Sequence, residues 1–181
     1  MNQSESNNYA LDNLLSELSL IKDLETRNFT TDVILHAPGL YWYRPSAFFR
    51  GHHPEDELGV WGNLIHVKRV LIIAKEFVGM EDLDVPSADA LYSGLTMHDI
   101  GKYGINGTEE RIQKNHPDLV AQILQRNRAN PITLIELIMG IVVTHMGRWG
   151  NIKPATQLEK IGGYCDCIAS RTSVVIPIKL K

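Results

Sequence analysis

The sequence predicts an all-α fold, a single compact domain of about six or seven helices spanning residues 1–181. Apolar residues recur at helical spacing along most of the chain. Prolines and polar capping residues stand where several of these segments begin. A length of 181 residues with 44% apolar side chains is enough for one sizeable core, whereas two domains would be cramped.

The N-terminal third is predicted to hold one helix and one long loop. Residues 1–8 are polar, and we expect them to be frayed. Residues 9–24 place leucines on one helical face, which predicts the first helix. Residues 37–60 are rich in Pro, Gly, His and aromatic side chains. We interpret them as an ordered loop with a functional role, since long loops in compact domains are usually functional or disordered.

Five further helices are predicted after this loop. Their segments are 61–78, the stretch ADALYSGLTMHDI with Pro86 in its first turn, HPDLVAQILQRN from His116, ITLIELIMGIVVTHM after Pro131, and 155–171. The tail SVVIPIKLK is rich in β-branched residues but is interrupted by Pro177. We therefore expect either a short β strand at an edge or an extended arm at the C-terminus.

The net charge and the cysteines bear on which partners the protein binds and on its cellular location. The net charge of −3 gives no general reason to expect nucleic-acid or membrane binding. No apolar run approaches the ~20 residues of a membrane span, and the polar start does not resemble a signal peptide. Cys165 and Cys167 stand too close together for an unstrained disulfide. We expect a cytoplasmic protein.

A series of polar side chains interrupts the apolar helices. Its members are His66, His98, Asp99, His116, His145 and Asp166. An unpartnered polar group in a core is costly, and imidazole nitrogens and carboxylate oxygens are good ligands for Mn, Fe, Co, Ni or Zn. A core histidine can also be simply hydrogen-bonded, and periodicity does not show whether these residues converge.

Five short motifs carry a resemblance to a known family. In order they are NLIHVKRV, MHDIGKYG, KNHPDLVAQIL, VTHMGRWG and LEKIGGYCDCIASR. The series resembles the HD-domain phosphohydrolase superfamily, and in particular the binuclear branch that includes the HD-GYP phosphodiesterases. The resemblance covers about residues 50–171. The chain departs from that branch in two places, because Met146 replaces the second of two adjacent histidines and the GYP motif is missing from RWGNIKP.

The resemblance implies a site for one or two divalent transition metals, with Mg as a further option at one position. Residues that would hold the first metal are His66, His98, Asp99 and Asp166. Asp99 would bridge to a second metal held also by His116 and His145. Two ions ~3.5–4 Å apart can clamp a phosphoryl oxygen and lower the pKa of the attacking water.

Two cationic residues are predicted to act beside these ligands. Lys102, one helical turn after His98, could neutralise a phosphate oxygen, or it could be an exposed lysine at a helix end. Arg148 could make a bidentate phosphate contact, or a surface salt bridge. Asp99, Lys102 and Arg148 are thus the predicted catalytic residues. Lys68 is interpreted as a snorkelling surface lysine and Trp149 as a core aromatic, although either could contact substrate.

The stretch RGHHPEDE is predicted to line the mouth of the pocket. Together with Lys102 and Arg148, the predicted substrate-binding residues are Arg50, His52 and His53. The acids at 55–57 are interpreted as a solvated charge run.

The function predicted from the resemblance is metal-dependent hydrolysis of a phosphate ester in a nucleotide or a related small molecule. An HD-type nuclease or phosphodiesterase acting on nucleic acid or a cyclic dinucleotide is one alternative. A non-catalytic nucleotide-binding sensor is another. The acidic net charge favours a small substrate over long nucleic acid.

Overall fold

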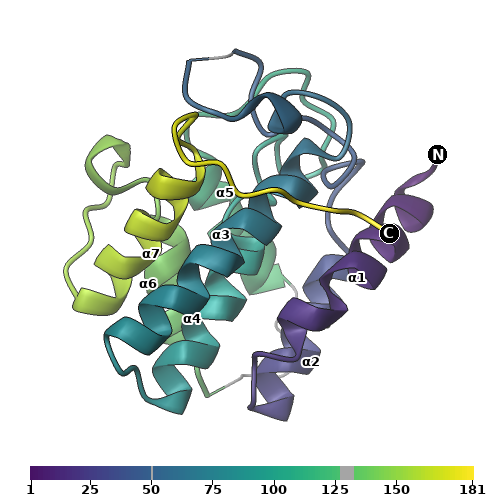
Figure 1. Cartoon of the computed structure of the whole chain (residues 1–181). Helices are drawn as coiled ribbons and strands as arrows, with labels where there is room; N and C mark the ends of the chain where they lie inside the picture. The colour runs from purple at the N-terminus through teal and green to yellow at the C-terminus, as the bar shows by residue number, and fades with distance from the viewer. Residues whose placement is uncertain (50, 127–132) are drawn as a thin grey trace.

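The computed structural model describes residues 1–49, 51–126 and 133–181, and within these ranges it is all-helical (Figure 1). The helices are α1 (Gln3–Leu18), α2 (Leu24–Leu35), α3 (Gly62–Met80), α4 (Val85–Met97), α5 (His116–Arg126), α6 (Ile135–Thr144) and α7 (Gln157–Ala169). Two short 3₁₀ turns, η1 (Glu55–Glu57) and η2 (Gly147–Trp149), lie in the connecting loops. The predicted fold class is confirmed.

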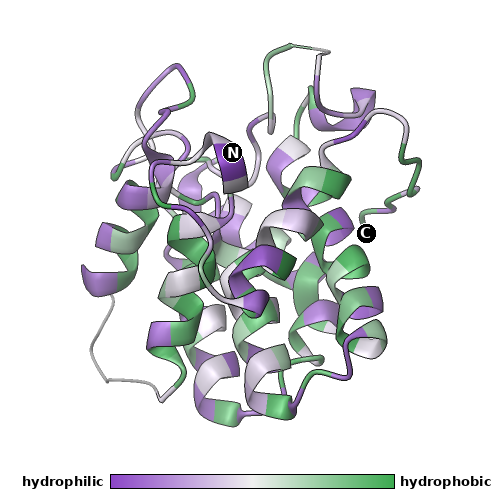
Figure 2. Ribbon diagram, turned by 90° about the vertical axis from the view of Figure 1, so that its left-hand side faces the viewer, coloured by the Kyte–Doolittle hydropathy of each residue, from purple (hydrophilic) through white to green (hydrophobic). Residues whose placement is uncertain are grey.

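Helix α4 lies at the centre of the helical bundle. It packs against α6, α2, α3 and α7, and it is buried from Ala88 to Met97. Its start follows the predicted signals, because the Asp84 side chain accepts a hydrogen bond from the amide of Ser87 and Pro86 stands in the first turn. The helices have both hydrophobic and hydrophilic faces (Figure 2). Because α4 is buried up to Met97, His98 and Asp99 at its C-terminal end lie in the interior.

Two glycines let α6 approach α4 and α7 closely. A Cβ atom on Gly94 of α4 or on Gly162 of α7 would lie 3.0 Å from Cγ2 of Ile141 in α6. Ile141 itself is fully buried. The small residues thus bring together the three helices that carry His98, His145 and Asp166.

The N-terminal segment differs from its prediction. Residues 1–8 were predicted to fray, but α1 begins at Gln3 with a capping box between Asn2 and Glu5. The side chain of Asn7 is buried and donates hydrogen bonds to carbonyls at the end of α2. The helix predicted over 9–24 is present but ends earlier than predicted, because α1 ends at Leu18 and a separate helix, α2, begins at Leu24.

The long loop and the C-terminal tail are both held against the helices. In the loop, Tyr41 and Trp42 are fully buried, and the side chain of Asn63 donates a hydrogen bond to the Tyr41 carbonyl. The tail has no strand within the described residues, so of the two predicted forms it adopts the extended arm. It runs across α3 to α1 (Figure 1), where the Tyr9 hydroxyl donates to the carbonyl of Lys181. Within the described ranges, the helices lack the combination of length and apolar character needed to cross a bilayer.

Candidate metal centre

Six side chains from five helical segments meet in one place. His66 comes from α3, His98 and Asp99 from the end of α4, His116 from the start of α5, His145 from the end of α6 and Asp166 from α7. They form three overlapping groups, and within each group the potential ligand atoms lie within 4.8 Å of one another. All are buried except Asp166, whose side chain is 19% exposed. The polar residues singled out in the sequence thus converge.

Asp99 joins the two halves of this cluster. Its Oδ1 atom lies 3.0 Å from Nε2 of His116 and 3.5 Å from Nε2 of His145. Its Oδ2 atom lies 3.1 Å from Nε2 of His98 and 3.8 Å from Nε2 of His66. Asp166 belongs to the same half as His66 and His98. Its Oδ1 atom lies 3.1 Å from Nε2 of His66 and 3.7 Å from Nε2 of His98.

Three of the four histidines are oriented by the same backbone contact. The Nδ1 atom of each lies close to the carbonyl oxygen three residues earlier. The distances are 2.7 Å from His98 to Leu95, 2.9 Å from His116 to Gln113 and 2.7 Å from His145 to Val142. A carbonyl only accepts hydrogen bonds, so we assign the proton of each ring to Nδ1. In the neutral ring the Nε2 lone pair then faces the centre of the cluster.

The centre consequently gathers imidazole nitrogens and carboxylate oxygens around one place, with the ammonium of Lys102 beside Asp99. The Nε2 atoms of His116 and His145 lie 3.1 Å apart, and both face Oδ1 of Asp99. The buried Nε2 atom of His98 has no hydrogen-bond partner among the described residues, despite its proximity to Asp99. Imidazole nitrogens and carboxylate oxygens in this arrangement fit a divalent transition-metal ion.

The electrostatics of the cluster also favour a cation. Burial opposes ionisation of Asp99, but His98 and Lys102 outweigh it and hold the pKa of this carboxyl well below its usual range. The pKa of Asp166 is likewise lowered, against the effect of burial, by His66 and His98. Burial lowers the pKa of His66 and that of His145, which keeps these rings neutral. In the absence of an ion, the two carboxylates raise the pKa of His98 to about 10, despite its burial.

Lys102 lies inside the site rather than at an exposed helix end. It is buried, and its Nζ atom lies 2.6 Å from Oδ2 of Asp99. The same nitrogen donates to the hydroxyl and the carbonyl of Ser46, at 3.1 and 3.2 Å. Its predicted contact with a phosphate stays a prediction.

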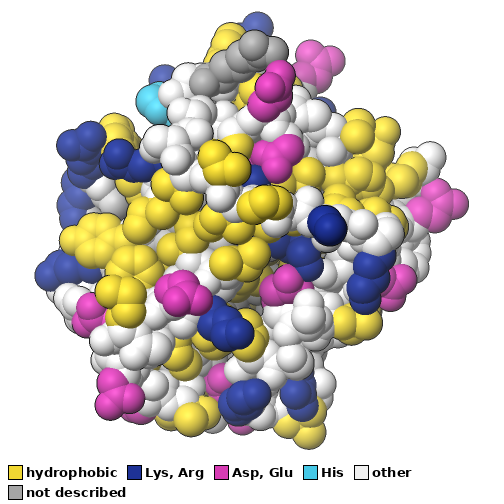
Figure 3. Space-filling view, viewed as in Figure 1, with side chains coloured by type: hydrophobic (Ala, Val, Ile, Leu, Met, Phe, Trp, Pro, Cys, Tyr) yellow, Lys and Arg dark blue, Asp and Glu magenta, His cyan; other side chains and the backbone are white. Residues whose placement is uncertain are grey.

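A cleft of about 1160 Å³ opens beside the cluster and reaches His145 and Asp166. Its described lining includes three cationic side chains, Arg148, Lys160 and Arg171, and one acidic side chain, Asp166. Lys and Arg side chains also gather along the left edge of the molecule in Figure 3, where α7 and the loop before it lie in Figure 1. The cleft is therefore suited to an anionic ligand.

Three of the predicted substrate-binding residues, His52, His53 and Arg148, line the cleft. Burial, with His66 and Lys102 adding to it, lowers the pKa of His53 to about 3. Arg148 is exposed and stacks 4.2 Å over the ring of Trp149. Trp149 is 61% exposed, so its interpretation as a core aromatic is wrong.

Two residues named in the predictions lie outside the described residues, and the interpretation of a third, Lys68, was wrong. Arg50 and Pro131 lie outside the described residues. Lys68 is buried and paired with Glu17 at 2.6 Å, so it is not a snorkelling surface lysine.

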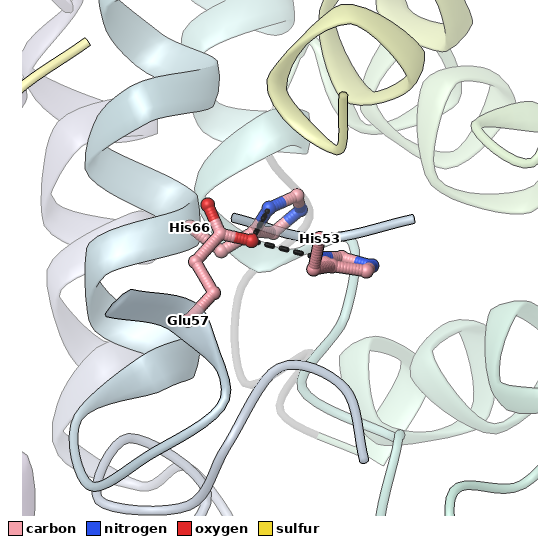
Figure 4. A group of neighbouring side chains, drawn as sticks. All are labelled: His53, Glu57 and His66. Atoms are coloured by element: carbon pink, nitrogen blue, oxygen red, sulfur yellow. Dashed lines mark hydrogen bonds and ion pairs between the residues drawn. The ribbon is translucent and has the colours of Figure 1, made fainter. Parts of the chain in front are cut away.

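Glu57 is the residue of this region that the sequence did not reveal. It was interpreted as part of a solvated charge run, yet it is fully buried. Its Oε2 atom lies 2.6 Å from Nδ1 of His53 and 3.1 Å from Nδ1 of His66 (Figure 4). Its Oε1 atom pairs with Arg69. One available signal was Arg69 itself, because an arginine on the apolar side of a helix needs a carboxylate partner.

Comparison with known proteins gives the family. Neither the curated proteins nor the solved structures yielded a match to this chain. The family model described as the HD domain matches residues 63–169, which is more than half of the chain and contains all six residues of the cluster. The resemblance to the HD-domain superfamily is thereby confirmed, and the chain belongs to this superfamily of metal-dependent phosphohydrolases.

Proposed function

We propose that this protein hydrolyses a phosphate ester of a nucleotide or a related small phosphorylated molecule, using bound divalent metal. The observation that carries the proposal is the convergence of four imidazoles and two carboxylates beside a cationic cleft. Pockets for small ligands commonly measure about 300–1,000 Å³. The cleft of about 1160 Å³ is large enough for a whole nucleotide.

The proposed ligands follow the two halves of the cluster. His66, His98, Asp99 and Asp166 would hold one ion. Asp99, His116 and His145 would hold a second. The donor set suits Mn, Fe, Co, Ni or Zn, with Mg as an option at one position. Such ions, when bound, neutralise phosphate oxygens and lower the pKa of a water that can attack phosphorus.

The remaining residues bind and orient the substrate. The guanidinium of Arg148 can hold two phosphate oxygens in a fixed plane. The ammonium of Lys102, already beside Asp99, adds positive charge next to the reacting group. His52 and His53 contact substrate from the long loop, and we keep Arg50 as a predicted contact. Two free cysteines fit the proposed cytoplasmic location.

The proposal is tested by a substrate screen on metal-loaded protein. Purified protein is assayed for phosphate release from nucleoside mono-, di- and triphosphates with added Mn²⁺ or Co²⁺. We expect turnover of at least one nucleotide, loss of turnover in Asp99→Asn, and full activity in Glu76→Gln, an exposed change on α3.

Three results would contradict the proposal. Less than one transition metal per chain after growth with Mn and Fe would remove its chemical basis. Cleavage of labelled single-stranded DNA or RNA without nucleotide turnover would favour the nuclease alternative. Nucleotide binding that depends on Asp99, with no turnover of any substrate, would identify a sensor.

A further inference from the structure

His66 differs from the other histidines of the cluster in how its ring is held. His98, His116 and His145 stand at helix ends, where each Nδ1 reaches a backbone carbonyl three residues earlier. His66 stands within α3, and its Nδ1 atom faces the Glu57 carboxylate at 3.1 Å instead. A side chain from the long loop thus occupies the position that a carbonyl takes for the others.

Glu57 is built into the protein as an acceptor. It is fully buried, and its Oε1 atom forms an ion pair with Arg69, a buried residue of the same helix as His66. The second oxygen, Oε2, is left to His66 and to His53 (Figure 4). An ionised carboxylate has no proton to donate, so each ring that pairs with this oxygen does so as the donor, from Nδ1. At His66 the Asp166 carboxylate, 3.1 Å from Nε2, competes for the ring proton, and a measurement of the tautomer decides between the two partners.

We propose that Glu57 is the positioning residue that makes His66 a metal ligand. By accepting the Nδ1 proton it fixes the tautomer in which the Nε2 lone pair faces Asp166 and Asp99, at 3.1 and 3.8 Å. The ligand role rests on the proposed function. The tautomer is a property of the protein without metal and can be measured separately. The same oxygen orients His53, so Glu57 also ties the cleft-lining loop to the metal centre.

The cluster of His53, Glu57 and His66 could in principle hold an ion of its own, since their potential ligand atoms also lie within 4.8 Å of one another. The guanidinium of Arg69 at Oε1 of Glu57 argues against this, because a second cation would lie next to a buried positive charge. The positioning role needs no such ion. The number of bound ions distinguishes the two possibilities.

The test uses Glu57→Gln, which keeps the shape of the side chain. The amide oxygen can still accept from Arg69, but the amide nitrogen then donates toward His66 and forces the ring proton to Nε2. Long-range ¹H–¹⁵N NMR of metal-free protein, with the His66 signals assigned through His66→Gln, should show Nδ1–H in the wild type and Nε2–H in Glu57→Gln. Affinity for Mn²⁺ should fall about 10–100-fold with the number of bound ions unchanged.

Asp56→Asn is the matched control. Asp56 also pairs with Arg69, at 2.8 Å, and its side chain is 44% exposed. The structure shows no contact between it and a histidine of the cluster among the described residues. This variant should keep the wild-type tautomer and Mn²⁺ affinity, and melting curves should show both variants folded.

Each contrary result has a defined meaning. Wild-type affinity in Glu57→Gln, equal weakening in Asp56→Asn, or loss of a whole bound ion in Glu57→Gln would each overturn the positioning role. An Nε2–H tautomer of His66 in the wild type would overturn it even if the variant failed to fold. Absence of Mn²⁺ binding in the wild type would refute the proposed function instead, while the tautomer measurement would still decide whether Glu57 positions His66.

Discussion

Lys102 and Lys68 are both buried lysines, but they belong to different parts of the molecule. Lys102 lies 2.6 Å from Asp99 at the metal centre, whereas Lys68 lies 2.6 Å from Glu17 between α3 and α1. Each ammonium contacts one carboxylate and donates a hydrogen bond to one backbone carbonyl oxygen. Comparing the two separates the effect of a charge at the site from the effect of a buried ion pair in the core.

Replacing Lys102 with Met should lower kcat/KM about 10²-fold, because a fixed cation beside the reacting phosphate is lost. Metal content should be unchanged, since an ammonium group binds no metal. Lys68→Met should leave kcat/KM intact while lowering the melting temperature. Steady-state kinetics with the best nucleotide of the screen, together with metal analysis, measure both. Equal losses of kcat/KM in the two variants would show that Lys102 acts only through the fold.

The two cysteines should differ sharply in reactivity. Burial, reinforced by the charge of Asp166, raises the pKa of the Cys165 thiol to about 12, so it carries almost no thiolate at neutral pH. Cys167 is partly exposed and lines the cleft. Iodoacetamide at pH 8 should therefore modify one thiol per chain, and Cys167→Ser should abolish the fast reaction. Mass spectrometry that found both thiols alkylated in folded protein would contradict this environment for Cys165.

At the scale of elements, helices whose buried face is apolar were predicted from the sequence. A helix whose buried face contains polar residues was missed. The helices α3, α4, α5 and α7 were all predicted, because their buried positions are mainly apolar and recur at helical spacing. Helix α2 was missed because Thr26 and Thr30 stand on its buried face beside Phe29 and Val33. A pattern that counts threonine as polar shows no stripe there.

The candidate site, like the fold, was predicted in part. Its six central residues were found through five motifs, each on a helix or at a helix end. Glu57 was not found, because it stands among three consecutive acids in a loop and only the folded chain shows which of them is buried. Loop geometry is set by distant contacts, such as the hydrogen bond from the Ser46 amide to the Glu57 carbonyl, which no local pattern reveals.

The close approach of α4 and α6 gives a prediction about Gly94. Alanine there would place Cβ 3.0 Å from Cγ2 and 3.1 Å from Cβ of Ile141, against fully buried neighbours. Overpacking of about 1–3 kcal/mol should outweigh the gain in helix propensity. Gly79→Ala is the matched control, since its Cβ would meet nothing within 4 Å. Urea unfolding should show Gly94→Ala less stable, and Gly79→Ala equal to or more stable than the wild type.

At the scale of the whole molecule, the cluster joins helices that are far apart in sequence. His66 and Asp166 are separated by 100 residues, and they meet through a single contact of 3.1 Å. Imidazole nitrogens and carboxylates converge there from α3, α4, α5, α6 and α7, so a cation bound between them attracts groups from all five helices at once. Metal binding should therefore stabilise the entire bundle and not only one loop.

This coupling predicts that divalent metal raises the unfolding free energy of the whole domain. An ion that binds only the folded state adds about 2.7 kcal/mol when its free concentration is 100 times its Kd. Melting temperature should accordingly rise with added Mn²⁺ and fall again with a chelator. Asp99→Asn, which removes the carboxylate common to both halves of the cluster, should melt at the same temperature with and without Mn²⁺. Glu76→Gln should respond as the wild type does. The melting temperature is measured by calorimetry. If that of the wild type changed neither with Mn²⁺ nor with chelator, the result would contradict a metal centre at the junction of these helices.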